Sequence, residues 1–273
     1  MSTCPPQESA SLSGNSGNLG VSAVYGDVRS RFLRSRQQSK RLSTNTVGVA
    51  RGEKFLVSKL VSALERKQRP GKKLVVTCEL DCFQGVADVV TGISNGYRLF
   101  PDSARSKLGL VSFSTAKVLS ALVGRKKSTT ERICLTTGLS YATVRKQLAL
   151  LDKLGVLRLR ANRSVWMVRK IRAPFEEITA FEVKVKDWKN GIYQARNYKS
   201  FAHKSNVALP MKRARLLKVR LQHFRRMRIG LLGIGPNGNL EWFLKPRRQK
   251  PISGPRNFFA AVRLLRDDKK KVA

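Results

Sequence analysis

Helically spaced and alternating apolar positions divide the chain into three blocks of predicted structure, beginning near residue 51. In the first block, residues 52–67 carry apolar side chains every three or four positions, which predicts an amphipathic helix. Two short runs with β-branched residues follow, Leu74–Thr77 and Val86–Thr91, and they predict the strands of a hairpin. This block therefore starts as a helix followed by two strands.

The second block, residues 103–170, has mostly helical spacing and ends in two short strands. Gly138 permits a tight turn, Ser140 is a suitable N-cap for the helix that follows, and Gly155 can end that helix. The predicted helices cover 110–123, 129–137 and 140–154, and the predicted strands cover 156–160 and 164–168. The expected core positions are Val118, Leu119, Leu122, Val123, Leu139, Val144, Leu148 and Leu151.

The third block, residues 171–245, returns to sheet structure. Phe181, Val183 and Val185 alternate with polar residues, which predicts a strand with one apolar face and one polar face. The further predictions are a helix over 192–202, a buried strand over 206–209, a basic helix over 211–228 and a hairpin turned at 236–239. Together the blocks predict an α/β fold.

The two ends of the chain differ from this pattern. Residues 1–50 are rich in Ser, Gly, Asn and Gln and contain a basic arm, so we expect a disordered basic segment. An Arg- and Ser-rich, acid-poor N-terminus also fits a transit peptide, although the Arg residues begin only near position 29. Residues 246–273 predict a basic C-terminal tail with a short helix over 257–265.

The charge balance indicates a polyanionic partner. The chain has 55 Lys and Arg against 17 Asp and Glu in 273 residues, a formal net charge of +38. Such a charge favours nucleic acid, whereas a membrane surface is the weaker interpretation because the basic residues do not form one cluster. No apolar run approaches the roughly 18 residues of a membrane span. We therefore expect no membrane association and a cytoplasmic, nucleoid-associated protein.

The cysteines do not indicate a metal site. The four cysteines are scattered without a CxxC pair and there are only two histidines, so free thiols are favoured over structural zinc.

The few acidic residues indicate a more specific function than the many basic residues do. Asp88 lies in an apolar strand, Glu182 and Lys184 lie two apart on the polar face of another, and Glu53 opens the first helix. Two carboxylates on adjacent strands can hold Mg²⁺ (or Mn²⁺), a hard cation that takes oxygen ligands and polarises a phosphoryl group. A lysine one strand period from a carboxylate points into the same site and can orient the attacking water.

These residues resemble the motifs of the PD-(D/E)XK nuclease superfamily, with a fold of mixed sheet flanked by helices. Asp88 matches the first catalytic Asp, and Glu182-Val183-Lys184 matches the (D/E)-x-K motif. The resemblance covers roughly 51–102 and 171–245. It implies that Asp88, Glu182 and Glu53 are metal ligands and that Lys184 acts on the water or the transition state.

A further motif is similar to the QxxxY motif of the recombination-helicase exonuclease branch. Gln194 and Tyr198 stand four apart on a predicted helix, which implies that Gln194 positions substrate and that Tyr198 is structural. Two features depart from the superfamily pattern. Ala87 replaces the Pro of the name-giving motif, and Asp88 and Glu182 stand 94 positions apart, much farther than usual. The iron–sulfur cysteines of some relatives have no counterpart.

The long separation has an explanation in residues 103–170, which resemble a winged helix-turn-helix domain inserted between the Asp strand and the E-x-K strand. The resemblance implies that the recognition helix and the wing tip contact duplex DNA in the major groove. The residues concerned are Ser140, Tyr141, Thr143, Arg145, Lys146, Gln147, Arg160, Asn162 and Arg163. The basic helix 211–228 carries eight Lys or Arg and no acid, so we also expect phosphate contacts from Lys212, Arg213, Arg215, Lys218 and Arg220.

These expectations lead to a Mg²⁺-dependent DNA nuclease that binds duplex DNA through the inserted domain. The alternative is a non-catalytic DNA-binding regulator or accessory factor built on the same fold. An RNA-associated basic protein suits the charge but not the predicted recognition helix. A palindromic recognition site would imply a homodimer, for which the sequence shows no readable interface.

Overall fold

The computed structural model describes residues 45–67, 71–81, 85–94, 96–160, 164–168 and 170–270. Most of the N-terminal segment that we predicted to be disordered lies outside these residues. Its last residues belong to the first helix, α2 (Asn45–Arg66), which begins before the residue 51 expected from the sequence.

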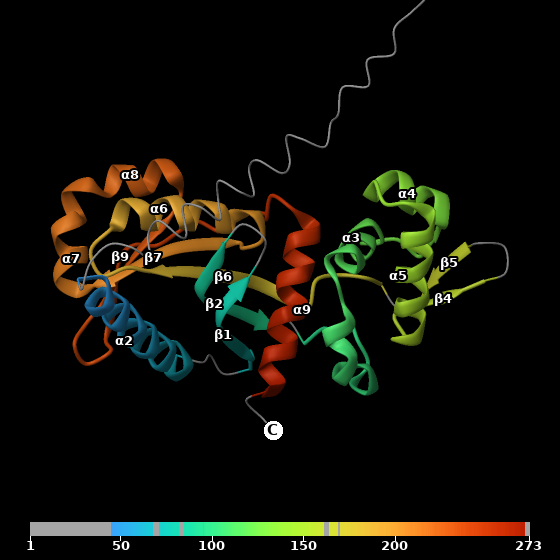
Figure 1. Cartoon of the computed structure of the whole chain (residues 1–273), viewed down its shortest axis with the longest axis horizontal. Helices are drawn as coiled ribbons and strands as arrows, with labels where there is room; N and C mark the ends of the chain where they lie inside the picture. The colour runs from blue at the N-terminus through green and yellow to red at the C-terminus, as the bar shows by residue number, and fades with distance from the viewer. Residues whose placement is uncertain are drawn as a thin grey trace, which may run out of the picture. The chain divides into compact units, whose positions relative to one another are not determined.

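A mixed six-stranded sheet organises the larger part of the fold (Figure 1). Its strands, in spatial order, are β1 (Leu74–Asp81), β2 (Val86–Ser94), β6 (Phe175–Val183), β7 (Lys204–Pro210), β8 (Gly230–Ile234) and β9 (Leu240–Leu244). The pairs β1–β2, β2–β6 and β8–β9 are antiparallel, whereas β6–β7 and β7–β8 are parallel. The α/β class predicted from the sequence is therefore confirmed, as a mixed sheet flanked by helices.

The helices cover the sheet on both faces. On one face, Leu56 and Leu60 of α2 pack with Phe181 and Val183 of β6, in agreement with the predicted apolar face of this strand. The opposite face packs against α6 (Trp188–Asn197), the short 3₁₀ helix η3 (Tyr198–Ser200) and α8 (Leu221–Met227). Strand residues alternate between faces, so Glu182 shares the face of Ala180, beneath α6 and η3.

The predicted basic helix is three consecutive pieces rather than one helix. They are α7 (Met211–Leu216), the 3₁₀ helix η4 (Leu217–Arg220) and α8. Ala214, Leu217 and Phe224 are buried, as the apolar spacing predicts, and the hairpin β8–β9 follows.

Residues 102–167 form a second core made of helices and a small sheet. The elements are η2 (Asp102–Leu110), α3 (Phe113–Ala121), β3 (Lys127–Thr129), α4 (Thr130–Thr137), α5 (Tyr141–Lys153), β4 (Leu157–Leu159) and β5 (Ser164–Met167). The three strands pair in the order β3-β5-β4. Gly138 adopts the left-handed conformation at φ 65°, and Ser140 accepts from the Thr143 N–H, as an N-cap does.

The second core differs from the sequence prediction at two places. Strand β3 was not predicted, because three residues between helices give no period that can be recognised. Val123 was expected to face inward but is 46% exposed, because α3 ends at Ala121 and the chain turns before that position.

The predicted C-terminal tail is largely a helix, α9 (Gly254–Lys270), which extends well beyond the short helix expected. Its apolar residues join both cores. Ala260 and Leu264 pack in the core of the large sheet, whereas Phe258 and Val262 pack with α3, beside which α9 lies in Figure 1. The predicted helix was too short because the apolar residues of α9 face two cores and so form no single apolar stripe.

In the part of the chain that the structure describes, no helix combines the length and the apolar character needed to cross a bilayer.

Candidate active site

The two acidic motifs meet where β2 pairs with β6. Val89 and Phe181 are register partners in this antiparallel pair, which brings Asp88 and Glu182 together despite the long separation in sequence. The Asp88 Oδ2 accepts a hydrogen bond from the backbone N–H of Val183 at 2.7 Å. The carboxylate of β2 is therefore fixed directly against the strand that carries Glu182.

Lys184 joins these carboxylates as their counter-ion. Its Nζ lies 2.7 Å from Glu182 Oε1 and 3.9 Å from Glu53 Oε2, and its side chain is 14% exposed. The backbone N–H of Lys184 donates to the carbonyl of Ala208, which ties the end of β6 to β7. The expected group of Glu53, Asp88, Glu182 and Lys184 is thus brought together.

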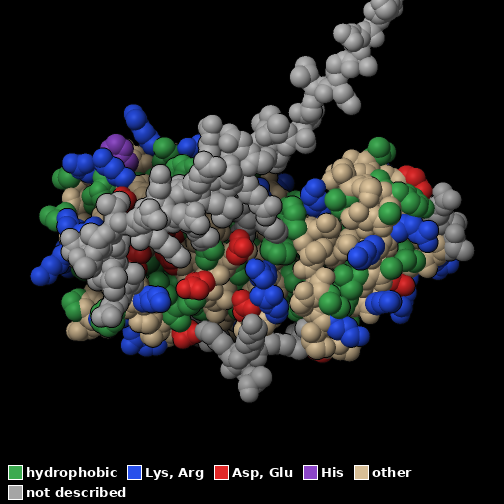
Figure 2. All heavy atoms as spheres, in the orientation of Figure 1, with side chains coloured by type: hydrophobic (Ala, Val, Ile, Leu, Met, Phe, Trp, Pro, Cys, Tyr) green, Lys and Arg blue, Asp and Glu red, His purple; other side chains and the backbone are tan. Residues whose placement is uncertain are grey.

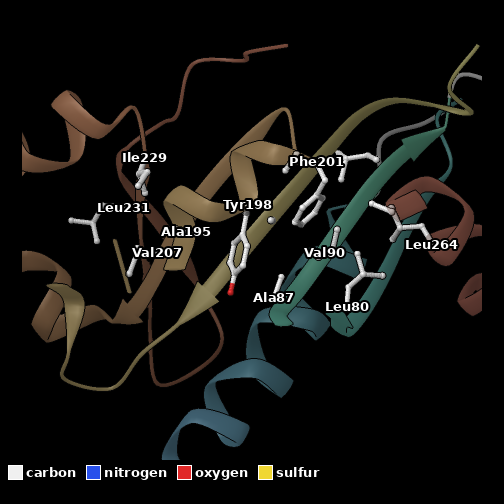
Figure 3. Packing of buried hydrophobic residues seen from close by; sticks show 14 of the residues in the cluster. Leu80, Ala87, Val90, Ala195, Tyr198, Phe201, Val207, Ile229, Leu231 and Leu264 are labelled. Carbon is white, nitrogen blue, oxygen red and sulfur yellow. The ribbon is translucent and has the colours of Figure 1, made fainter. Parts of the chain in front are cut away.

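Tyr198 completes the contacts of Glu182. Its hydroxyl donates to Glu182 Oε2 and lies 2.9 Å from the carbonyl oxygen of Val86. Figure 3 shows this ring extending from the end of the helix toward the strand that carries Ala87. Tyr198 is only 1% exposed, so the predicted structural role is accompanied by a direct contact with a candidate metal ligand.

Gln194 lies one helical turn before Tyr198 but makes a different contribution. Its Oε1 is buried and has no hydrogen-bond partner among the described residues. No hydrogen bond joins it to the carboxylates in the described ranges, so its predicted role in positioning substrate stays a prediction.

Gly191 also shapes the site, although it was not predicted from the sequence. A Cβ at this position would lie 3.2 Å from Cγ of Lys184 and 3.1 Å from Cγ1 of Val207. The absence of a side chain there lets α6 approach the stem of Lys184 closely. A glycine inside a helical pattern was the available signal.

Burial and mutual repulsion raise the pKa values of the acidic residues of this site. Burial and the neighbouring Asp88 raise the pKa of Glu182 from 4.5 to about 7, against the lowering effects of Lys184 and Tyr198. Burial also raises the pKa of Asp88 and of Glu53. Burial opposes the charged form of Lys184, but the surrounding carboxylates, Glu182 foremost, leave its pKa raised. One cation thus faces three carboxyl groups.

The carboxylates of this site fit Mg²⁺ as a pair rather than as a group of three. Among the described residues no group of three or more His, Cys, Asp and Glu is arranged to hold a metal ion. Mg²⁺ usually needs only one or two carboxylates and keeps several waters. Lys184 and Tyr198 engage the two oxygens of Glu182, but an ionised carboxylate has about four lone-pair sites. Asp88 and Glu182 therefore fit Mg²⁺ as a pair, whereas Glu53 contacts Lys184 and stays a predicted ligand.

The predicted recognition helix presents most of its polar residues to solvent. Ser140, Tyr141, Arg145 and Lys146 are exposed. Thr143 is half-buried and hydrogen-bonded to Ser140. At the neighbouring strands, Arg160 is exposed with its guanidinium 5.3 Å from the ring centroid of Trp166. Asn162 and Arg163, the predicted wing tip, lie outside the described residues.

Gln147 differs from the other residues predicted to contact DNA. It was expected to face a DNA groove, but only 8% of it is exposed and its Oε1 accepts from the hydroxyl of Thr115 at 2.7 Å. The helical position that it occupies faces α3 rather than solvent. Gln147 therefore connects two helices of the second core.

The predicted phosphate-contacting residues Lys212, Arg213, Arg215, Lys218 and Arg220 are all exposed. Three of them interact with neighbouring side chains, which the sequence did not predict. Arg215 lies 3.5 Å from Glu241, Lys218 lies over the ring of Phe243, and Arg220 lies over Trp188. Figure 2 shows further Lys and Arg side chains distributed across the visible face.

No protein-family model, curated protein or solved structure matches this chain.

Proposed function

We propose that the protein is a Mg²⁺-dependent DNA nuclease that hydrolyses phosphodiester bonds at the Asp88–Glu182–Lys184 site. The observation that carries the proposal is the contact of these residues from distant parts of the chain. Asp88 is bonded to the strand of Glu182, and Lys184 lies 2.7 Å from Glu182. A buried pair of carboxylates beside a lysine has the donor set that metal-assisted phosphoryl transfer requires.

The order of elements supports the same proposal. Helix α2, the hairpin β1–β2, strand β6, helix α6 and strand β7 follow one another as helix–hairpin–strand–helix–strand, the succession on which the PD-(D/E)XK resemblance is based. Residues 102–167 interrupt this succession between β2 and β6, which accounts for the separation of the two acidic motifs.

Each residue has a definite role in this proposal. Asp88 and Glu182 would hold Mg²⁺, which when bound supplies charge neutralisation at the phosphoryl oxygens and lowers the pKa of water. The ammonium of Lys184 orients the attacking water and offsets charge on the phosphorane. Tyr198 fixes the carboxylate of Glu182, and the unpartnered Oε1 of Gln194 positions substrate.

Duplex binding by the inserted region is the second part of the proposal. The order α3, β3, α4, α5, β4, β5 with a β3-β5-β4 sheet is compatible with a winged helix-turn-helix, in which α5 enters the major groove. The exposed Tyr141, Arg145 and Lys146 would face the bases and phosphates, with Arg160 at the base of the wing.

Incubation of plasmid and linear DNA with Mg²⁺ or Mn²⁺ tests the proposal. Wild type is expected to cleave, whereas Asp88→Ala and Lys184→Ala are expected to bind DNA without cleaving. Glu176→Ala, an exposed acid in the same strand β6, is the matched control and should retain cleavage.

A non-catalytic regulator is the competing function, and one observation favours it. Both oxygens of Glu182 already have partners in Lys184 and Tyr198, so the site is stable as a buried polar network. Tight DNA binding by the wild type, without cleavage of any substrate in either metal, would support the regulator and overturn the nuclease.

A further inference from the structure

A basic hollow of about 570 Å³ lies beside the helix that carries Tyr198. Its wall comes from the end of α6 with η3, from the end of α8, and from the segment that leads into α9. None of its lining residues belongs to the carboxylate site. The residues that matter are Arg196, Lys199, Ser200, Arg226, Arg228 and Arg256.

The charge of the basic hollow is uncompensated. Five of its lining residues are Lys or Arg, and none of the described residues lining it is Asp or Glu. Burial, followed by repulsion from Arg228 and Arg196, lowers the pKa of Lys199. An adjoining hollow of about 300 Å³ shares Arg228 and adds further Lys and Arg residues, again without an acid among its described lining. An anion is the ligand that this lining would stabilise.

A buried hydroxyl provides an independent observation. Ser200 lines the basic hollow, is 5% exposed, and its Oγ has no hydrogen-bond partner in the described part of the chain. Buried polar groups without a partner are rare in folded proteins and call for an explanation. An oxygen of a bound anion would accept this hydrogen bond.

The wall of the basic hollow is held by the fold. The backbone N–H of Ser253 donates to the carbonyl of Ser200 at 3.0 Å, and Lys199 Nζ donates to the carbonyl of Met227 at the end of α8. Arg228 ends α8 in the left-handed conformation at φ 50°. Its side chain therefore leaves the helix in a direction that a regular C-terminal turn would not give.

We propose that the basic hollow binds a phosphate group of the DNA strand that enters the carboxylate site. The inference rests on the proposed function. Tyr198 reaches inward to Glu182, while its neighbour Lys199 lines the basic hollow. The carboxylate site and the basic hollow are therefore contacted by consecutive residues of η3.

The test is Ser200→Ala, with Ser205→Ala as the matched control. Ser205 is also buried with an unpartnered hydroxyl, but it lies in β7 and does not line the basic hollow. Binding is measured in EDTA, without hydrolysis, with labelled single-stranded oligonucleotides that end in 5′-phosphate or 5′-hydroxyl, and with pyrophosphate as the free anion. Ser200→Ala should weaken oligonucleotide binding about tenfold or more, and Ser205→Ala should not.

Arg228→Gly is a second variant that removes charge and retains the left-handed backbone. It should reduce the slope of log affinity against log salt by about 0.7 for each phosphate lost from a single strand. Lys67→Gln is the control for loss of charge, because Lys67 is exposed, follows the end of α2 and does not line the basic hollow.

The outcomes separate the sources of the phosphate. A loss with both oligonucleotides supports an internal phosphate, and a loss confined to the 5′-phosphorylated one supports a terminal phosphate. A loss of pyrophosphate binding alone, or no loss with either Ser200→Ala or Arg228→Gly, overturns the proposal. Because no cleavage is measured, a strand-binding result stands even if the nuclease function fails.

Discussion

Tyr198→Phe removes one hydroxyl from the most buried contact of the candidate site. In the wild type this hydroxyl donates to Glu182 Oε2, and Tyr198 is 1% exposed. A hydrogen bond to a charged group contributes about 1.5–3 kcal/mol, so the free energy of unfolding should fall by about 2 kcal/mol where Glu182 is ionised. At a pH about 1.5 units below the pKa of Glu182 the carboxyl is neutral, and the loss should be only about 1 kcal/mol.

The assay is urea unfolding of both proteins at about pH 8.5 and about pH 5.5, on the two sides of this pKa. A loss of about 2 kcal/mol also predicts a fall in Tm of about 4–8 °C for a chain of this size. Tyr193→Phe is the control, because Tyr193 lies on α6, directly before η3, and is 58% exposed. Equal effects of the two substitutions, or a larger effect at the lower pH, would refute the reasoning.

Three further predictions concern the pH dependence and the packing. Because burial and Asp88 raise the pKa of Glu182 from 4.5 to about 7, the folded protein retains a proton that the unfolded chain releases. The contribution of Glu182 to stability therefore falls by about 3 kcal/mol as the pH rises from about 4.5 to about 7, and Asp88→Asn should reduce this fall in urea titrations. Gly92→Ala should destabilise the fold by about 2 kcal/mol, because its Cβ would lie 2.6 Å from the ring of Phe175, and thermal unfolding will measure the loss. Gln147→Ala should lower the free energy of unfolding by about 0.5–1.5 kcal/mol, because it removes the buried hydrogen bond from the hydroxyl of Thr115; an altered DNA sequence preference with unchanged stability would contradict this.

The sequence predicted those elements whose apolar period is long and uninterrupted. Helix α5 was expected close to its observed position, because it buries one recurrent set of side chains. Helix α2 begins earlier than predicted, and β6 ends at Val183, before the predicted Val185, and is buried on both faces. The same reasoning failed for α9, in which Phe258 and Val262 face one core while Ala260 and Leu264 face another. A helix buried on two sides has no single apolar stripe to recognise.

The candidate site was predictable as a set of residues but not as a network. Asp88, Glu182 and Lys184 could be selected because acids are scarce and the spacing is that of a strand. The hydrogen bond from Val183 N–H to Asp88 and the contact of Tyr198 with Glu182 depend on strand register and helix placement, which no local pattern encodes. Gln147 shows the reverse case, since its residue type suggested DNA while its helical position directed it to α3.

The most direct test of the account is the rate of Mg²⁺-dependent cleavage of a labelled duplex by wild type, Asp88→Asn, Glu182→Gln and Lys184→Met, with Glu176→Gln as control. We expect cleavage by the wild type and by the Glu176→Gln control. Each of the other three variants should cleave at least about 10²-fold more slowly while still folding and binding DNA. Cleavage at the wild-type rate by any of the three, or none by the wild type, would contradict it.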